Sequence, residues 1–271
     1  MSHYINQIDW PLLEQGILNF SRIQATHKRL TNILESHIEI QEKLDITEEF
    51  IKFIQSEDYN SVRLDLASFE SDFDFKKILE RIKVSALVEI PELNQIILCL
   101  EFAQSYNKIV SSHVPSLYVE LSKIRKTVLE FRKFVDPEGS IEFEKHPVLR
   151  PLYHKLKEKE SKIRLSLEKM IKDPEFSSNL QIQQHDVIND VYVLPIKSDH
   201  YQGIFGKIVG RSESGKTLFV EPAQISSANS ERLSIVLEID KVISRIEQEF
   251  IDKLNEHSLE TRRSVDNVLF M

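Results

Sequence analysis

Residues 206–222, which read GKIVGRSESGKTLFVEP, decide the fold of this 271-residue chain. Two runs rich in β-branched and aromatic residues, Ile208-Val209 and Leu218-Phe219-Val220, flank the glycine-containing stretch Gly210–Gly215. Runs of this composition favour strands, and glycine between them favours a turn. The stretch therefore predicts a β-hairpin.

Residues 210–217 also fit G-x-x-x-x-G-K-[ST], the expression for a phosphate-binding loop. In such a loop a helix begins at the lysine, so that its positive end faces the phosphate. Here Thr217–Val220 favours a strand, and Pro222 would break any helix after about one turn. No later βαβ pattern supplies the rest of an α/β nucleotide domain. We therefore predict a hairpin turn, and a small nucleotide-binding enzyme is the least favoured hypothesis.

The sheet extends upstream of the hairpin. Val187-Ile188, Val191–Leu194 and Ile204-Phe205 have the same strand-favouring composition, and four of the six glycines fall between Gly203 and Gly215. A second turn is expected near Ser198–Gln202. These signals predict a small antiparallel sheet of three or four short strands.

Long helices flank the predicted sheet. Leu152–Lys172 has neither Gly nor Pro and is stopped by Asp173-Pro174, while Ala223–Met271 has neither residue over its whole length. If helical for about 35 residues, the second run would reach about 50 Å at 1.5 Å per residue. The sheet is thus expected at the tip of a two-helix arm.

Upstream, residues 12–135 predict helix after helix, because apolar residues recur at intervals of three and four, beginning with Leu12, Leu13, Ile17 and Leu18. Pro91 suits the first turn of a helix, and Pro115 is expected to break one. Asp136–Ser140 is the first strong turn signal. The fold class is therefore mainly α with a small antiparallel β insertion.

Composition excludes several function classes. The net charge of −8 argues against a uniformly basic protein that coats nucleic acid. The single cysteine, Cys99, lies in an apolar run and is expected in the core, and the histidines show no metal-ligand spacing. We find no catalytic constellation, no secretory signal and no apolar run near the roughly 20 residues that span a bilayer. The chain is expected to be cytoplasmic, without cofactor or metal of its own.

Residues 206–222 resemble the clamp hairpin of bacterial MutS homologues, in the second branch, which lacks the mismatch-reading N-terminal domains. The pattern there is approximately G-[IF]-V-H-D-x-S-x-[ST]-G-x-T-[LV]-F-[IV]-E-P. Tyr192–Lys197 is similar to the [YL]-V-[IL]-P-V-K strand of that branch, and Asp136–Gly139 and Ala228-Asn229 also match. The resemblance covers about residues 136–235. Val209 and Gly210 stand where the family has His-Asp, and Ile188 and Val191 stand where it has arginines.

The resemblance implies a long-helix lever domain that carries a β clamp. It divides the chain into a helical core/lever domain at 1–150, an outgoing lever helix at 151–180, the β clamp at 181–225 and a returning lever helix at 226–271. In the family, two such arms of a homodimer close around nucleic acid, and an ATPase domain that would begin after residue 271 drives them with ATP and Mg. The implied partners are branched or structured DNA, in recombination suppression, or the ribosome and its rRNA, and no membrane.

The candidate nucleic-acid contacts are polar residues on or beside the predicted hairpins: Lys197, Lys207, Arg211, Ser212, Ser214 and Lys216. Ordinary solvated lysines, and serines that satisfy the turn backbone, are the alternative. A basic run on the outgoing helix comprises Lys155, Lys157, Lys159, Lys162 and Arg164. Interleaved glutamates favour a solvated face with i,i+4 pairs over the wall of a DNA channel. The rival function is a helical dimerisation or protein-interaction arm without direct nucleic-acid contact.

Overall fold

The computed structural model describes residue 15 and residues 37–68 and 74–270, so the helical residues predicted at Leu12, Leu13, Ile17 and Leu18 lie outside the described residues. The chain divides into two compact units, one formed by residues 1–142 and 245–271 and the other by residues 143–244. Of the first unit, the helices are α4 (His37–Ile54), α5 (Asp58–Ser68), α6 (Phe75–Lys83), α7 (Ile90–His113), the 3-10 helix η2 (Pro115–Leu117), α8 (Ser122–Arg132), the last turns of α11 (Ser226–Glu256), and α12 (Ser258–Phe270).

Helix α7 is the longest element that lies wholly within the first unit among the described residues. Pro91 occupies its first turn, and the Glu92 carboxylate accepts a hydrogen bond from the Glu89 amide at 3.3 Å. The buried carboxylate of Glu247 accepts from the Ile90 amide at 3.1 Å, and burial raises the pKa of Glu247. The helix ends at His113, before Pro115. Both proline predictions are confirmed.

The core of the first unit lies along one face of α7, where Leu93, Ile96, Ile97, Cys99 and Leu100 are fully buried. Burial raises the pKa of the Cys99 thiol, since the thiolate would lose its hydration. The prediction of a buried core cysteine is therefore confirmed.

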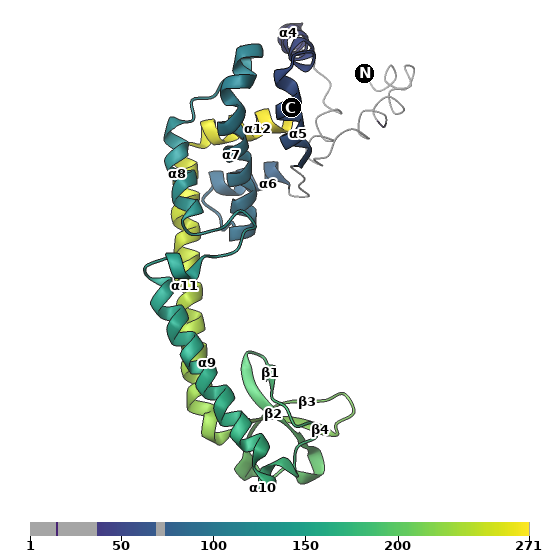
Figure 1. The fold of residues 1–271 in the computed structure, drawn as a ribbon, viewed down its shortest axis with the longest axis vertical. Helices are drawn as coiled ribbons and strands as arrows, with labels where there is room; N and C mark the ends of the chain where they lie inside the picture. Colours follow the sequence, from purple (N-terminus) through teal and green to yellow (C-terminus); the bar gives the residue numbers. More distant parts are fainter. Residues whose placement is uncertain (1–14, 16–36, 69–73, 271) are drawn as a thin grey trace. The chain divides into compact units, whose positions relative to one another are not determined.

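The second unit contains the two-helix arm and the sheet. Helix α9 spans Leu149–Lys172 and ends before Pro174, as predicted, while the short α10 (Pro174–Ser177) follows. Helix α9 begins three residues earlier than the expected Leu152. Pro151 is tolerated in its first turn, because the missing N–H of proline would have no helical partner there. Within this unit, α9 and residues 226–244 of α11 run side by side, with the strands at the far end of α9 (Figure 1).

The sheet is antiparallel, in the order β1-β2-β4-β3. Its strands are β1 (Asp186–Ile188), β2 (Val191–Lys197), β3 (Gly206–Arg211) and β4 (Thr217–Pro222). One face packs on Ile163, Leu167 and Met170 of α9, and the strand residues of this cluster are Tyr192, Leu194, Ile196, Leu218 and Val220. The mainly α fold with a small antiparallel sheet on a two-helix arm is confirmed.

The connection between β2 and β3 corrects one prediction. Both strands pair antiparallel with β4, one on each side, so they run in the same direction and their connection must return along the sheet. The predicted strand at Ile204-Phe205 is wrong, because these residues lie in that return as the 3-10 helix Gly203–Phe205 (η5). The Phe205 ring packs edge-on against Phe176, with centroids 5.2 Å apart.

The turn between β1 and β2 has two residues, Asn189 and Asp190, which both have positive φ. Such a turn matches the right-handed twist of the strands, and Asn and Asp are the non-glycine residues that best tolerate it.

The stretch after the sheet is not one helix. Helix α11 covers 31 residues and ends at Glu256, and α12 begins at Ser258 although the sequence there contains neither Gly nor Pro. Burial of Val265 and Val268 of α12, and a hydrogen bond of 2.6 Å from the Asn267 amide to the Leu117 carbonyl, fix the new direction. Tertiary packing thus ends α11 where no local signal does.

Candidate nucleic-acid interface

The β3–β4 hairpin contains the complete phosphate-loop expression, residues 210–217. Its turn is closed by a hydrogen bond from the Ser212 amide to the Thr217 carbonyl at 3.0 Å and by one from the Gly215 amide to the Ser212 carbonyl at 2.9 Å. Gly215 has φ +70°, which favours glycine. Strand β4 follows at once, so no helix N-terminus faces the loop (Figure 1). The predicted hairpin is confirmed.

An irregularity in β3 shapes the hairpin. Ile208 pairs with Val220 and Gly210 pairs with Phe219, so Val209 is an extra residue in β3. A bulge of this kind bends the strand and increases its twist. The bulge lies two residues before Arg211, near the end of β3 that leads into the turn.

The four predicted cations of the sheet differ in their contacts. Lys197 donates to the Ser178 carbonyl at 3.0 Å, which ties it to the chain that precedes the sheet. The side chains of Lys207, Arg211 and Lys216 are exposed, and within residues 37–68 and 74–270 none of them forms an ion pair. The hairpin thus presents three cations whose charge is not neutralised by a neighbouring carboxylate.

Lys207 forms no ion pair within the described residues, although it lies opposite Glu221 in the ladder. Side chains at directly opposed positions share a face of the sheet, so an ion pair would be expected there. The Glu221 carboxylate is instead buried and accepts a hydrogen bond from the Asn229 amide at 3.0 Å. Glu221 is thus engaged by α11, and within the described residues it forms no ion pair with Lys207.

The two candidate serines differ in their contacts. The Ser212 hydroxyl accepts from the Thr217 amide at 3.1 Å and lies 3.4 Å from the Ser214 hydroxyl. Ser212 therefore satisfies turn backbone, whereas Ser214 is exposed beside Glu213, the one carboxylate of the turn. The structure brings Arg211, Ser212, Ser214 and Lys216 together at the tip and leaves Lys197 and Lys207 on the strands.

Four of the five basic side chains in the run on α9 are paired with glutamates, whereas Lys155 is exposed and forms no ion pair within the described residues. Its ion pairs, from the lysine or arginine nitrogen to the carboxylate oxygen, are Lys157–Glu160 at 3.5 Å, Lys162–Glu158 at 2.5 Å, Arg164–Glu160 at 3.1 Å, and Lys159–Glu231. The hydrogen bond and charge of Lys162 lower the pKa of Glu158. The predicted pairing at helical spacing is confirmed.

Sequence reasoning gave no structural role to three residues that hold the sheet on the arm: Tyr192, Asn229 and Arg232. The Asn229 amide is hydrogen-bonded to both backbone groups of Tyr192, and the Arg232 guanidinium lies 5.5 Å from the Tyr192 ring centroid. A signal was available, because Asn229 falls four residues after Ile225 and four before Leu233, at the spacing of one helix face. A polar residue at such a position needs a buried partner.

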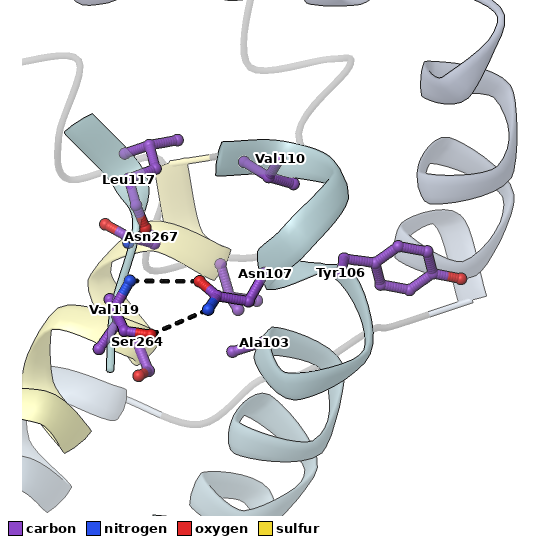
Figure 2. Close-up of a pocket in the computed structure, with 9 residues that line it drawn as sticks. Ala103, Tyr106, Asn107, Val110, Leu117, Val119, Ser264 and Asn267 are labelled. Atoms are coloured by element: carbon purple, nitrogen blue, oxygen red, sulfur yellow. Dashed lines mark hydrogen bonds between the residues drawn. The ribbon is translucent and has the colours of Figure 1, made fainter. Parts of the chain in front are cut away.

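A cavity in the first unit does not offer a ligand site. It has a volume of about 20 Å³, enough for one water molecule. Figure 2 shows the Asn107 side chain in its wall, hydrogen-bonded to both backbone groups of Val119 at 2.9 and 3.2 Å. The polar groups of Asn107 are therefore already satisfied by the chain.

Neither metal-binding nor membrane-spanning features emerge from the part of the chain that the structure describes. No group of three or more His, Cys, Asp or Glu side chains there is placed to hold a metal ion. None of the described helices combines the length and apolarity required to cross a bilayer.

Comparison with known proteins gives one consistent result. No protein-family model matches the chain. Curated proteins called endonuclease MutS2 are similar to it: that of Aquifex aeolicus is 21% identical over 270 residues, that of Halalkalibacterium halodurans 28% over 196, and that of Clostridium novyi 25% over 252. These alignments cover 96%, 68% and 84% of this chain but 34%, 25% and 31% of those proteins. The chain thus spans a quarter to a third of their length.

Proposed function

Because the chain is a MutS2-like family member that spans part of its relatives' length, we propose that it is a non-catalytic lever and clamp region. In this proposal the β3–β4 hairpin contacts the phosphate backbone of branched or structured nucleic acid. The chemistry that consumes ATP belongs to a part of the parent protein outside residues 1–271. Two copies, joined in the parent as a homodimer, would bring two hairpins to one nucleic-acid segment.

One observation carries the proposal: Lys207, Arg211 and Lys216 are exposed and free of ion pairs among the described residues, on a hairpin that leaves the arm. An unpaired cation can replace condensed counterions on a phosphate backbone, and their release drives binding. A cation that already has a carboxylate partner must first lose that partner. The free charge of the sheet therefore lies on this hairpin, with Arg211 and Lys216 at its tip and Lys207 on β3.

The same residues define what kind of recognition to expect. Lysine and arginine contacts to phosphates fix the position of a protein on a duplex but carry no sequence information. The tip offers hydroxyl and cationic groups, with Glu213 as its single carboxylate. We expect binding that depends on shape and salt and not on base sequence.

Salt titration with a four-way-junction DNA tests the proposal. Three phosphate contacts predict that log K falls with log salt at a slope of about −2.7, and the double variant Arg211→Gln/Lys216→Gln should reduce this slope to about −0.9. The matched control is Lys157→Gln/Lys162→Gln on α9, which removes the same charge from side chains that are already paired with Glu160 and Glu158. The control should leave the slope unchanged.

Two outcomes would contradict the proposal. Equal slopes for the two double variants would mean that the hairpin cations are not special. Negligible binding at low salt would favour the rival, a helical arm that binds protein, such as a ribosomal surface or a second copy. The exposed side chains of Leu165 on α9 and Leu237 on α11 support that rival, since exposed leucines on a helical arm offer apolar contact area.

A further inference from the structure

One buried amide ties α11 to two strands of the sheet. Asn229 is 1% exposed, and its Nδ2 donates to the Tyr192 carbonyl at 3.1 Å and to Glu221 Oε1 at 3.0 Å. Its Oδ1 accepts from the Tyr192 amide at 3.2 Å. Tyr192 belongs to β2 and Glu221 to β4, so a single side chain makes three hydrogen bonds across two strands.

Arg232, one turn further along α11, extends these contacts to α9 and to the first turn of the sheet. Its Nη1 donates to the Asp190 carbonyl at 2.9 Å, and its Nε donates to Glu160 Oε1 at 3.3 Å. Helix α9, helix α11 and the β1–β2 turn are therefore joined by one polar network, which we call the Asn229–Arg232 network after its two central residues.

The exposed end of the hairpin has no comparable support. Between Arg211 and Lys216 the hydrogen bonds of the described residues run within the turn, apart from one from the Ser198 amide to the Lys216 carbonyl at 3.0 Å. The apolar cluster between the sheet and α9 holds the sheet on this helix through the hydrophobic effect, which is not directional. Hydrogen bonds to a buried amide are directional, so they fix the angle between β4 and α11.

We infer that Asn229 is a positioning residue, which holds β2 and β4 on α11 so that the hairpin cations meet a phosphate backbone in one orientation. This inference rests on the proposed function. Three satisfied bonds to one buried amide make its orientation unique, because any rotation would leave buried polar groups unpaired.

The variants that test the inference change one atom at a time. Asn229→Asp keeps the shape but loses both donated hydrogen bonds, and it places a carboxylate against the Glu221 carboxylate and the Tyr192 carbonyl. Glu221→Gln keeps an acceptor for Asn229. In the double variant Asn229→Asp/Glu221→Gln, the new amide of residue 221 can donate to the new carboxylate of residue 229. Ser230→Ala is the control, since Ser230 is an exposed neighbour whose hydroxyl bonds to the Ser226 carbonyl of the same helix.

The direct readout is the mobility of the hairpin tip in the 271-residue chain without nucleic acid. Ser214→Cys supplies a site for a spin label, and labelling is selective because Cys99 is buried. Asn229→Asp should increase label mobility and, in unlabelled protein, weaken four-way-junction binding by about fivefold. Glu221→Gln and Ser230→Ala should leave both quantities within about twofold of the unsubstituted chain. The double variant should recover at least half of both losses.

A folded Asn229→Asp variant with unchanged tip mobility would overturn the inference. So would a double variant without recovery, since the effect would then be a general loss of packing. If Asn229→Asp does not fold, Glu221→Ala, which removes one of the three bonds, should give a smaller rise in mobility, and no rise would overturn the inference. Increased mobility in a chain whose unsubstituted form does not bind the junction would refute the proposed function and leave the positioning role standing.

Discussion

Two groups of basic side chains in the second unit have similar composition but different surroundings. On α9, Lys157, Lys159, Lys162 and Arg164 all have carboxylate partners. On the β3–β4 hairpin, Lys207, Arg211 and Lys216 have none among the described residues. The density of lysine and arginine in a sequence therefore does not measure the charge that is available to a ligand.

The difference follows from the period of each element. On a helix, residues three and four apart are neighbours, so the glutamates interleaved with the basic run pair with it. In an antiparallel ladder, the neighbour is the opposed residue, which is Leu218 for Arg211 and Glu221 for Lys207. Leu218 cannot pair, and Glu221 is bound by Asn229. The strand register thus gives Arg211 no opposed carboxylate, and the carboxylate opposite Lys207 is buried against α11.

The largest effect is expected where the paired group is buried. The Glu160 and Arg232 side chains are 11% and 12% exposed, and their ion pair joins α9 to α11. Glu160→Ala leaves Arg232 without its carboxylate partner in the interior, which should cost about 3–5 kcal/mol of unfolding free energy. Urea denaturation of both chains measures this loss of unfolding free energy. Glu158→Ala, which removes an exposed carboxylate two residues away, is the control, and equal losses from both variants would contradict the argument.

The next effect concerns the tip of the hairpin. Glu213 is the one carboxylate of the turn, between Arg211 and Lys216. Glu213→Gln should raise affinity for four-way-junction DNA by about two- to fivefold at low salt, because one repulsive charge near a phosphate in water is worth about 1 kcal/mol or less. The gain should vanish at high salt, where the charges are screened.

The same substitution on α9 sharpens the comparison. Glu158→Gln makes an identical change of charge and frees Lys162 from its partner. If α9 faces solvent and not nucleic acid, junction affinity should stay within about twofold of the unsubstituted chain. An increase equal to that of Glu213→Gln would mean that α9 forms part of the binding surface.

Local signals in the sequence were sufficient for much of the fold. Pro91, Pro115 and Pro174 mark helix boundaries that the structure confirms, because proline acts through its own ring and missing N–H. The hairpin at Gly210–Thr217 was predictable for the same reason: glycine and β-branched residues act within a few positions of the chain. These are statements about the local backbone, which a single sequence contains.

Features set by distant contacts were not predictable. The strand predicted at Ile204-Phe205 is a crossover, since the strand order of the sheet decides which way the chain must return. The break at His257 depends on the packing of α12 against α7. The residue opposite Lys207, Glu221, is hydrogen-bonded to Asn229, which lies on another element, 22 positions after Lys207 in the sequence. Each of these outcomes depends on contacts with residues that are distant in the sequence.

The smallest expected effect is a pH dependence on α9. The hydrogen bond and charge of Lys162 lower the pKa of Glu158 below its ordinary value of 4.5. A carboxyl whose pKa is lower in the folded state stabilises the fold above its unfolded pKa, and this stabilisation is lost as the pH falls through the folded pKa. The unsubstituted chain should therefore have a slightly higher Tm than Glu158→Gln at about pH 7, and the two should converge at about pH 3.

Thermal unfolding of both chains at the two pH values measures this difference, which is small because both side chains are exposed. Lys162→Gln should give the same pH profile, since either substitution removes the pair. No such dependence is expected for Arg211→Gln or Lys216→Gln, because neither side chain has a carboxylate partner among the described residues. A difference that persists for Glu158→Gln at acid pH would come from helix propensity or packing, and the distinction between paired and free cations would then lack this support.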